Sequence, residues 1–523
     1  MRRRTLRAAY AALVLILAIA GGAASAAGGS AGGEDTGRPN IVVIVSDDQE
    51  LRSLTADLMP NTAGLAADST VLSRYFVTTP QCCPSRATFL TGQYGHNNGV
   101  LSNEPGYPDL RHKASILPAW LQAAGYRTAH VGKYLNEFES GPDGRRGVPP
   151  GWDLWHAQLL PWTYFDYDLA ANGEVRHYGH KPADYLGRVV TKQAVSVTRR
   201  FADAGKPLYL QVDLFQPHKQ IRGRGGRCAR SAVPDPRDRD LARTLKLPPT
   251  AAFNERDVSD KPPFIAELPR LDRQARGEVA RDYGCRAASL RSLDREVGRI
   301  LDAIAASGSA EDTVVLFTSD NGFFLGEHRI PQSKILPYEE AIHMPALIRV
   351  PQAVLGSAPP ERLQPLLANV DLAPTLLELA GAHPCTEAGR CRPLDGHSIV
   401  PLLRGEAPDW AEHRAIELEY SGRPNEVAGP LGAATPCSYE GVRTGSASFV
   451  RYLTVPSGGR CVPSDARELY SLADDPSQLR NLHPPGAASQ APVLESAMQS
   501  RLDALRTCAG TEEAPVSGRA PCE

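Results

Sequence analysis

The chain has 523 residues, of which 42% are hydrophobic and 22% charged, and it contains 46 glycines and 44 prolines. This composition excludes a disordered, collagen-like or coiled-coil chain and a polytopic membrane protein, and it predicts a loop-rich globular protein. The formal net charge of −2 gives no overall positive field, so we expect no nucleic-acid partner.

The N-terminus has the pattern of a secretory signal peptide over residues 1–26. Four arginines precede an apolar run over residues 8–20, and Ala24-Ser25-Ala26 fits the small-residue rule for cleavage. The run is shorter than the ~20 residues that a helix needs to cross a bilayer. We therefore predict a secreted or extracytoplasmic protein without stable membrane insertion, with a flexible leader over residues 27–37. A retained membrane anchor is the alternative.

Export to an oxidising compartment favours disulfides among the ten cysteines. Proximity in sequence suggests the pairs Cys385–Cys391, Cys437–Cys461 and Cys508–Cys522, which leaves Cys228 for Cys285. Eight cysteines allow many connectivities, so this pairing is a hypothesis from loop length alone. Their spacing is not typical of structural zinc.

Buried strands and amphipathic helices alternate along the first 384 residues. Continuous apolar runs at residues 41–45, 208–215, 314–318 and 346–350 predict strands buried on both faces. Helices are predicted at residues 115–124 and 276–306, so the pattern indicates an α/β fold with a mostly parallel, doubly wound sheet. Ligands of such sheets bind beyond the carboxyl ends of the strands, where three of these four runs deliver polar residues.

The composition of the sequence changes near residue 385: glycine, proline and cysteine become frequent, and the predicted strands become short. We expect a catalytic α/β domain over residues 38–384 and a smaller C-terminal α+β subdomain over residues 385–523, with a late helix at residues 492–506. An irregular stretch at residues 221–262 is predicted to be a surface insertion. It carries Arg222, Arg224, Arg227, Arg230, Arg237, Arg239 and Arg243.

Such an arginine run is usually a solvated surface, and Asp235, Asp238 and Asp240 partly cancel its charge. The functional alternative is a basic rim that steers an anionic substrate. Steering predicts that added salt slows turnover of a polymeric substrate more than that of a small one.

Residues 82–92 form the most specific motif of the chain. Pro84 suits the first turn of a helix and Gly92 its end, so Cys82 is expected at the helix N-terminus, where backbone N–H groups favour negative charge. Arg86 returns to the same face one turn later. A nucleophile, a fixed cation and a helix N-terminus together make an oxyanion site. The alternatives are a vicinal disulfide between Cys82 and Cys83 or two ordinary buried thiols.

The pattern Cys82-x-Pro84-Ser85-Arg86, followed by Leu90-Thr91-Gly92, resembles the signature of the formylglycine-dependent (type I) sulfatases. The resemblance covers residues 38–482 and is closest to the glucosamine-6-sulfatase-like branch, which also holds bacterial arylsulfatases. It implies an alkaline-phosphatase-like α/β core. Further matching segments are Pro39-Asn40-Ile41, Asp47-Asp48, Gly132-Lys133-Tyr134-Leu135-Asn136-Glu137, Ser319-Asp320-Asn321-Gly322, Lys334, Asp395-Gly396-x-Ser398, Glu468-Leu469-Tyr470 and Asp475-Pro476.

A metal site is expected where two strands far apart in the sequence end. Asp47, Asp48, Asp320 and Asn321 offer only oxygen atoms, which suit Ca²⁺ or Mg²⁺ rather than zinc or copper. The resemblance implies Ca²⁺, with the modified Cys82 side chain as a further ligand. Gln49 and Glu50 are interpreted as loop.

The resemblance also implies that a formylglycine-generating enzyme oxidises Cys82 during maturation. The hydrated aldehyde supplies the nucleophile for hydrolysis of a sulfate monoester, either an aryl sulfate or a 6-O-sulfated N-acetylglucosamine-type sugar. Arg86, Lys133 and Lys334 are expected around the sulfate. His218 is the expected acid for the leaving alcohol, with Lys334 assisting. The covalent sulfo-enzyme would then break by elimination.

One position departs from the family pattern. Many sulfatases have a histidine two residues after the lysine of the Gly-Lys motif, as the base for elimination, and here Leu135 stands there. The glucosamine-6-sulfatase-like branch shares this leucine. The base stays unassigned, with His96, His328 and Asn136 as candidates for this role or for substrate contact. His130 and His343 are interpreted as structural.

Two other functions are compatible with these motifs. The first is a phosphodiesterase or phosphonate monoester hydrolase, because related folds use the same nucleophile and metal pocket. The second is a non-catalytic protein that binds sulfated glycans and keeps Cys82 as a thiol. The presence of Cys82, Arg86, Lys133, His218 and Lys334 together argues against the second.

Overall fold

The computed structural model describes residues 37–141, 144–201, 205–221, 223, 226–422, 435–457 and 460–523. The predicted signal peptide and nearly all of the predicted leader lie outside these residues. Among the helices described, none is both long and apolar enough to cross a bilayer.

A ten-stranded sheet forms the centre of the fold. Its spatial order is β11-β2-β10-β9-β1-β8-β4-β5-β6-β7. The central strands β9, β1, β8, β4 and β5 are parallel to one another, whereas β10, β6 and β7 pair in antiparallel fashion. The strands are β1 (Asn40–Ser46), β2 (Thr70–Leu72), β4 (Arg127–Gly132), β5 (Leu154–Gln158), β6 (Tyr167–Ala171), β7 (Glu174–Tyr178), β8 (Leu208–Asp213), β9 (Thr313–Ser319), β10 (Ala346–Arg349) and β11 (Arg362–Leu363).

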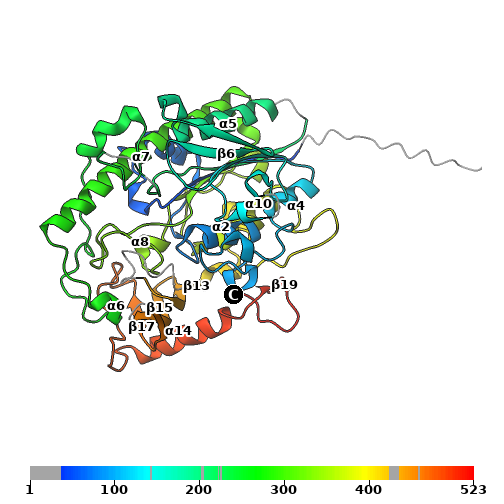
Figure 1. Cartoon of the computed structure of the whole chain (residues 1–523). Helices are drawn as coiled ribbons and strands as arrows, with labels where there is room; N and C mark the ends of the chain where they lie inside the picture. The colour runs from blue at the N-terminus through cyan, green and yellow to red at the C-terminus, as the bar shows by residue number, and fades with distance from the viewer. Residues whose placement is uncertain are drawn as a thin grey trace, which may run out of the picture. The chain divides into compact units, whose positions relative to one another are not determined.

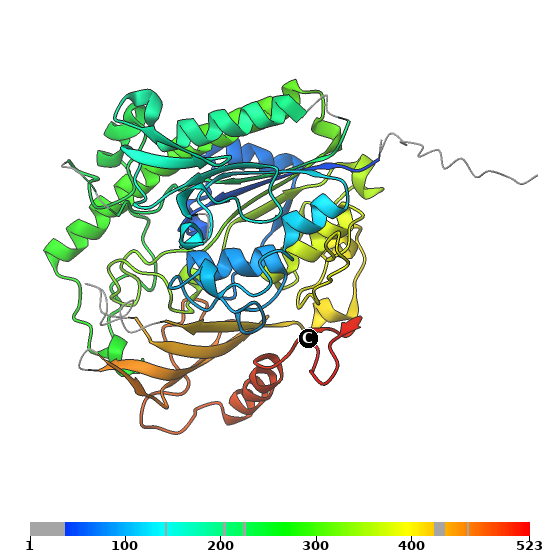
Figure 2. The same ribbon diagram turned by 45° about the vertical axis from the view of Figure 1, so that its right-hand side comes forward.

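The apolar run of β1 is buried on both faces because helices cover both sides of the sheet (Figures 1 and 2). Ile41, Val43 and Val45 pack into one core with the first set of helices, and Val42 and Ile44 pack into a second core with the other set. The first set contains α2 (Cys82–Thr91), α4 (Leu117–Ala123) and α10 (Leu372–Leu379). The second contains α5 (Leu186–Phe201) and α7 (Arg273–Ala306).

A separate antiparallel sheet follows in the C-terminal part of the chain. Its order is β13-β14-β15-β16, and β17 also pairs with β15. The late helix α14 (Pro492–Leu505) packs against this sheet, as Figure 1 shows. The strands are β13 (Ala415–Ser421), β14 (Ser438–Thr444), β15 (Ala447–Ser457), β16 (Arg460–Pro463) and β17 (Arg467–Ser471).

These elements confirm the predicted fold class: a mostly parallel sheet flanked by helices, with a smaller α+β part at the C-terminus. The predicted helices lie within three residues of α4, α7 and α14. All four suggested disulfides form, namely Cys228–Cys285, Cys385–Cys391, Cys437–Cys461 and Cys508–Cys522, while Cys82 and Cys83 are not disulfide-bonded. Residues 36–523 make one compact unit, so the domain boundary at residue 384 stays a prediction.

Candidate active site

Helix α2 places Cys82 at its first position, as the motif predicted. The helix ends at Gly92, which takes a left-handed conformation with φ of 61° and accepts the close approach of Leu394. Every residue of α2 is buried, because the helix lies between the main sheet and the segments around α10. The N-terminal turn of α2 therefore presents Cys82 inside the protein, next to the carboxyl ends of the central strands.

The carboxyl ends of β1 and β9 bring two polar pairs together. These strands are parallel neighbours with Ser46 opposite Ser319, so the residues that follow them meet at one edge of the sheet. The Asp48 backbone N–H donates to Asp320 Oδ1 at 3.1 Å, and Asn321 Nδ2 donates to Asp48 Oδ1 at 2.7 Å. Asp48 takes a φ of 67°, which an aspartate tolerates better than most residues and which turns the chain sharply after β1.

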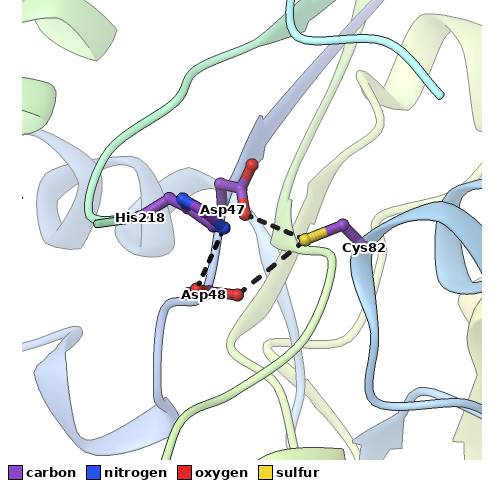
Figure 3. A group of neighbouring side chains, drawn as sticks. All are labelled: Asp47, Asp48, Cys82 and His218. Carbon is purple, nitrogen blue, oxygen red and sulfur yellow. Dashed lines mark hydrogen bonds and ion pairs between the residues drawn. The ribbon is translucent and has the colours of Figure 1, made fainter. Parts of the chain in front are cut away.

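Cys82 faces these carboxylates, as Figure 3 shows for Asp47 and Asp48. The Cys82 Sγ atom lies 3.3 Å from Asp47 Oδ1 and 4.0 Å from Asp48 Oδ1. We call Asp47, Asp48, Cys82, Asp320 and Asn321 the strand-end cluster. All five side chains are buried.

Three cations surround the strand-end cluster. Lys334 Nζ lies 2.8 Å from Cys82 Sγ and also contacts Asp48, and Lys133 Nζ lies 2.5 Å from Asp47 Oδ2. Arg86 Nε donates to Asp320 Oδ2 at 2.8 Å, and Arg86 Nη2 lies 3.5 Å from Asp47 Oδ2. Charges that are removed from water need such partners, and here each carboxylate has at least one.

His218 follows β8 and reaches the same place from a third strand. Its Nε2 atom lies 3.6 Å from Asp48 Oδ2, and its Nδ1 atom lies 2.6 Å from the Lys219 carbonyl oxygen. Figure 3 shows the ring on the opposite side of the carboxylates from Cys82. The Trp162 ring packs edge-on against His218 and lies 4.5 Å from Lys133 Nζ, so an aromatic wall closes this side of the site.

Burial and neighbouring charges act on the protonation states in opposite directions. Burial, and secondly Asp47, raises the pKa of the Cys82 thiol above its ordinary range. Burial would also raise the pKa of Asp48, but Lys334, His218 and Arg286 outweigh it and hold that pKa well below its usual value. For Lys334, burial lowers the pKa and Asp48 more than compensates, so the ammonium group stays charged.

The donor set of the strand-end cluster fits a hard divalent cation. Asp48 Oδ2 and Asn321 Oδ1 are buried oxygen atoms that accept no hydrogen bond from any described residue. Unpartnered buried oxygens of this kind are costly unless a cation binds them. The ligand atoms of Asp47, Asp48, Cys82 and His218 also lie within 4.8 Å of one another. Carboxylate and amide oxygens favour Ca²⁺ or Mg²⁺.

The structure thus brings together every residue of the predicted catalytic and metal sets, whereas the two histidines considered as elimination bases pair with carboxylates outside these sets. His96 contacts Glu417 and Glu419 at 3.0 and 3.2 Å, and His328 contacts Glu255 at 2.7 Å. Leu135 is buried in the hydrophobic core, and the backbone carbonyl of Asn136 accepts from Tyr107.

Two supporting residues escaped the sequence analysis. Asp213, at the end of β8, binds Arg86 Nη1 at 2.9 Å and His130 Nε2 at 2.8 Å. A lone carboxylate inside an apolar strand was a usable signal for Asp213. Arg286, in the middle of α7, donates to the Asp48 and Pro217 carbonyl oxygens. No sequence pattern distinguishes Arg286 from the other arginines of that helix.

Glu50 also has a definite place in the structure. It is buried and pairs with Arg286 at 3.3 Å, so the loop after Asp48 is fixed from beneath. Gln49 is buried as well, and its backbone N–H donates to Ser319 Oγ at 2.9 Å. The loop that Gln49 and Glu50 form is therefore a packed part of the site wall.

Comparison with known families gives two matches along this chain. Residues 39–382 match the family described as Sulfatase, and residues 326–507 match the family described as N-sulphoglucosamine sulphohydrolase, C-terminal.

Two curated relatives resemble the chain over most of its length. An arylsulfatase of Volvox carteri is 31% identical, covering 90% of this chain and 74% of the relative. An N-acetylglucosamine-6-sulfatase of Homo sapiens is 28% identical, covering 91% of this chain and 86% of the relative.

Two solved structures share the fold. One, described as a complex with its substrate D-glucosamine-2-N,6-O-disulfate, has a TM-score of 0.70 at 21% identity and covers 89% of this chain and 97% of that one. The other, a phosphonate monoester hydrolase of Agrobacterium radiobacter, has a TM-score of 0.63 at 19% identity and covers 92% and 100%. At these identities the likeness concerns the fold alone.

Proposed function

The chain belongs to the sulfatase family, and we propose that it hydrolyses sulfate monoesters at the strand-end cluster through a formylglycine made from Cys82. The observation that carries this proposal is the placement of Cys82. It is buried at the N-terminus of α2, 3.3 Å from Asp47 Oδ1 and 2.8 Å from Lys334 Nζ. A thiol whose pKa is raised by burial is a poor nucleophile, and conversion to an aldehyde hydrate removes that obstacle.

Residues of the strand-end cluster would hold the two groups that the chain itself does not encode. Asp47, Asp48, Asp320 and Asn321, with the modified residue 82, would hold a Ca²⁺ ion, which supplies positive charge beside the sulfate oxygens. The formylglycine hydrate supplies an oxygen that attacks sulfur, and its collapse to the aldehyde releases the sulfate.

The cations of the site have distinct tasks in this proposal. Arg86 is held by three carboxylates, Asp47, Asp213 and Asp320, so its guanidinium is fixed in direction before substrate binds. Lys133 and Lys334 approach the cluster from two other segments of the chain. Together they neutralise the charge that the sulfate group brings into a buried site.

We propose His218 as the acid for the leaving alcohol. Burial, together with Lys133 and Lys334, holds the pKa of its ring well below the usual value in the substrate-free site, so this role requires the anionic sulfate ester to raise that pKa on binding. Its Nε2 atom faces Asp48 and its Nδ1 atom lies against the Lys219 carbonyl oxygen, which fixes the ring plane. Lys334 would assist from the Cys82 side. A proton delivered by such a positioned ring matters most for a poor leaving group, such as a sugar alcohol.

The substrate that we propose is an aryl sulfate or a 6-O-sulfated glucosamine-type sugar. The Volvox arylsulfatase and the human N-acetylglucosamine-6-sulfatase, which resemble this chain at 31% and 28% identity, support this choice. The four disulfides support maturation outside the cytoplasm, after export by the predicted signal peptide.

Two measurements on the protein from its exporting host test the proposal. The mass of the peptide that carries residue 82 should show the loss of the thiol and the gain of an aldehyde. Hydrolysis of 4-nitrophenyl sulfate should depend on that modification. An unmodified thiol throughout an active preparation would contradict the nucleophile assignment.

The second candidate is a phosphonate monoester hydrolase, favoured by the shared fold with the Agrobacterium enzyme. Aryl sulfate and aryl methylphosphonate should be assayed side by side on the same modified preparation. A kcat/KM for the phosphonate above that for the sulfate would replace the sulfatase proposal with this one. The absence of turnover for both, with sulfated sugars still bound, would favour a non-catalytic glycan-binding protein.

A further inference from the structure

The arginine-rich insertion, apart from Arg222, Arg224 and Gly225, which lie outside the described residues, packs against α5 and α7. The Cys228–Cys285 disulfide attaches the insertion to α7, with the two Cα atoms 5.6 Å apart. The short helix η7 (Pro236–Arg243) lies directly on α7, and Gly284 permits this contact because a Cβ there would stand 2.3 Å from the Ala242 carbonyl oxygen.

Two aspartates of the insertion, Asp235 and Asp238, point inward. Asp235 is buried and binds Arg188 of α5 at 2.7 Å and Arg237 at 3.1 Å. Asp238 is buried and binds Arg295 of α7 at 2.7 Å. These aspartates therefore neutralise arginines that anchor the insertion, and they do not neutralise the arginines on its outer side.

The outer side of the insertion forms two neighbouring clefts, of about 690 and 490 Å³. Arg227 and Arg243 line both clefts, so the two are continuous along the surface. We call them together the basic groove. Six cationic side chains line it, against two carboxylates, Asp166 and Asp240. The cations are Arg227, Arg239, Arg243, Lys246, Arg276 and Arg281.

These cations are available to a ligand. Arg239, Arg243 and Arg281 are exposed, and they form no ion pair with any residue that the structure describes. Arg227 donates from Nε to the Ala242 carbonyl oxygen at 3.2 Å, which leaves its outer nitrogens toward the groove. The lining is basic rather than aromatic: among the described residues its aromatic rings are those of Phe165, His180 and Phe253.

One end of the groove shares its walls with the candidate active site. Pro161 and Thr163 line the first cleft and flank Trp162, whose ring contacts Lys133 and His218. Gln220 lines the same cleft two residues after His218. The first cleft therefore lies next to the wall that Trp162 and His218 form at the candidate active site.

We propose that the basic groove binds the further anionic groups of a sulfated glycan chain whose sulfate ester is held at the strand-end cluster. This rests on the proposed function and narrows it, because a small aryl sulfate has one anionic group and cannot reach the groove. Several exposed cations in a row match a ligand with repeated sulfate or carboxylate groups. A nucleic acid fits less well, because binding of single strands relies on aromatic stacking platforms.

The test compares two triple variants with equal loss of charge. The groove variant is Arg239→Gln, Arg243→Gln and Arg281→Gln; the control is Arg199→Gln, Arg362→Gln and Arg390→Gln, at exposed arginines elsewhere. With a heparin octasaccharide as the probe, in a Cys82→Ala background, the groove variant should raise Kd about tenfold and lower the salt dependence of binding. The control variant should bind like the parent.

Kinetics in the modified enzyme give the second readout. The groove variant should raise KM for a 6-O-sulfated octasaccharide and leave kcat/KM for 4-nitrophenyl sulfate within about twofold of the parent, since exposed charges are screened from the buried site. Equal losses in both triple variants, or unchanged octasaccharide binding in the groove variant, would overturn the proposal. So would equal affinity for a single-stranded DNA of matched charge.

These outcomes are separable from failure of the proposed function. Binding to the Cys82→Ala protein does not require turnover, so it tests the groove even if no sulfate ester is hydrolysed. Conversely, aryl sulfate turnover with no role for the groove arginines would leave the sulfatase proposal in place and remove only the glycan assignment.

Discussion

Within the part of the chain that the structure describes, two clusters contain the residue types that bind metals, and they differ in how many charged groups converge on one point. The strand-end cluster has buried oxygens, such as Asn321 Oδ1, that accept no hydrogen bond from the described residues. The second, which we call the His96 cluster, joins His96 to Glu417 and Glu419 of β13. There His96 Nδ1 faces both carboxylates, and Nε2 lies 3.0 Å from the Cys508 carbonyl oxygen.

We therefore interpret the strand-end cluster as a reactive site and the His96 cluster as a structural contact. Both ring nitrogens of His96 face acceptors, so the ring is an imidazolium ion and offers no lone pair to a metal. Its charge joins the segment after α2 to the C-terminal sheet. The strand-end cluster instead keeps acceptors and cations directed toward a common point. A buried ion pair alone therefore does not identify an active site. The convergence of several carboxylates and cations on the Cys82 side chain distinguishes the strand-end cluster.

The largest effect is expected from Cys82→Ala. If residue 82 supplies the nucleophile, kcat/KM for 4-nitrophenyl sulfate should fall by at least about 1,000-fold, because the remaining groups only bind and polarise the ester. The melting temperature should change little. Cys83→Ala is the matched control, one residue along the same buried helix, and it should keep its activity. Residual activity near wild type in Cys82→Ala would refute the assignment.

Metal removal should affect the strand-end cluster alone. Treatment with EGTA should abolish turnover, and Ca²⁺ should restore it better than Mg²⁺. Added Ca²⁺ should raise the melting temperature, because it binds only the folded state. Asp320→Asn should reduce this rise, while Glu417→Gln should keep it. Loss of the Ca²⁺ effect in Glu417→Gln would show that the His96 cluster also binds the metal.

A smaller effect is expected from His218→Gln, and it should depend on the substrate. For a sugar sulfate the leaving alcohol needs a proton, so kcat should fall by about 100-fold. For 4-nitrophenyl sulfate the leaving group is stable as an anion, and the loss should be much smaller. A series of aryl sulfates with increasing leaving-group pKa measures this. Equal losses across the series would exclude His218 as the acid.

The smallest effect concerns stability at the His96 cluster. Burial, and secondly Glu419, raises the pKa of Glu417, so the folded protein retains a proton that the unfolded chain has released above pH 4.5. Stability therefore declines as pH rises past that value. Burial lowers the pKa of His96, but its two carboxylate partners raise it to about 11, so His96 contributes a decline only above pH 6.5.

Between pH 5 and 6.5, therefore, Glu417 changes the free energy of unfolding with pH and His96 does not. Across that window Glu417→Gln should gain on the order of 1–2 kcal/mol in free energy of unfolding relative to wild type. Urea unfolding at several pH values measures the difference. Glu406→Gln, at an exposed site, is the control. Its free energy of unfolding should change with pH in the same way as that of wild type. Parallel curves for Glu417→Gln as well would mean that Glu417 is ionised across the window.

The sequence predicted the parts of the site that follow strand ends. Asp47 and Asp320 come after buried apolar runs, and the pairing of β1 with β9 brings them together as the parallel-sheet rule requires. The helix start at Cys82 followed from Pro84 and Gly92. Short loops between cysteines suggested three of the disulfides, because a short loop closes at a low entropic cost, and Cys228–Cys285 was the remaining pair.

Contacts that depend on packing of distant elements could not be predicted. Arg286 reaches the Asp48 carbonyl oxygen only because α7 crosses beneath the strand ends, and nothing in the local sequence encodes that crossing. The sequence also does not show that the Asp235 and Asp238 side chains point inward. For that reason we expected them to cancel part of the arginine charge on the surface of the insertion. In the structure these aspartates pair with Arg188 and Arg295.

One stretch of α7 connects the two functional regions through three successive residues. Gly284 accommodates η7, Cys285 carries the disulfide to the insertion, and Arg286 holds the backbone of Asp48. Neighbouring helix positions point about 100° apart, so one turn can hold partners on different sides. Residues on the outer face of the insertion can therefore change while the contacts of Gly284, Cys285 and Arg286 keep the insertion and the Asp48 backbone in place. If the basic groove binds glycan as we propose, this architecture lets substrate preference change without altering the residues around Cys82.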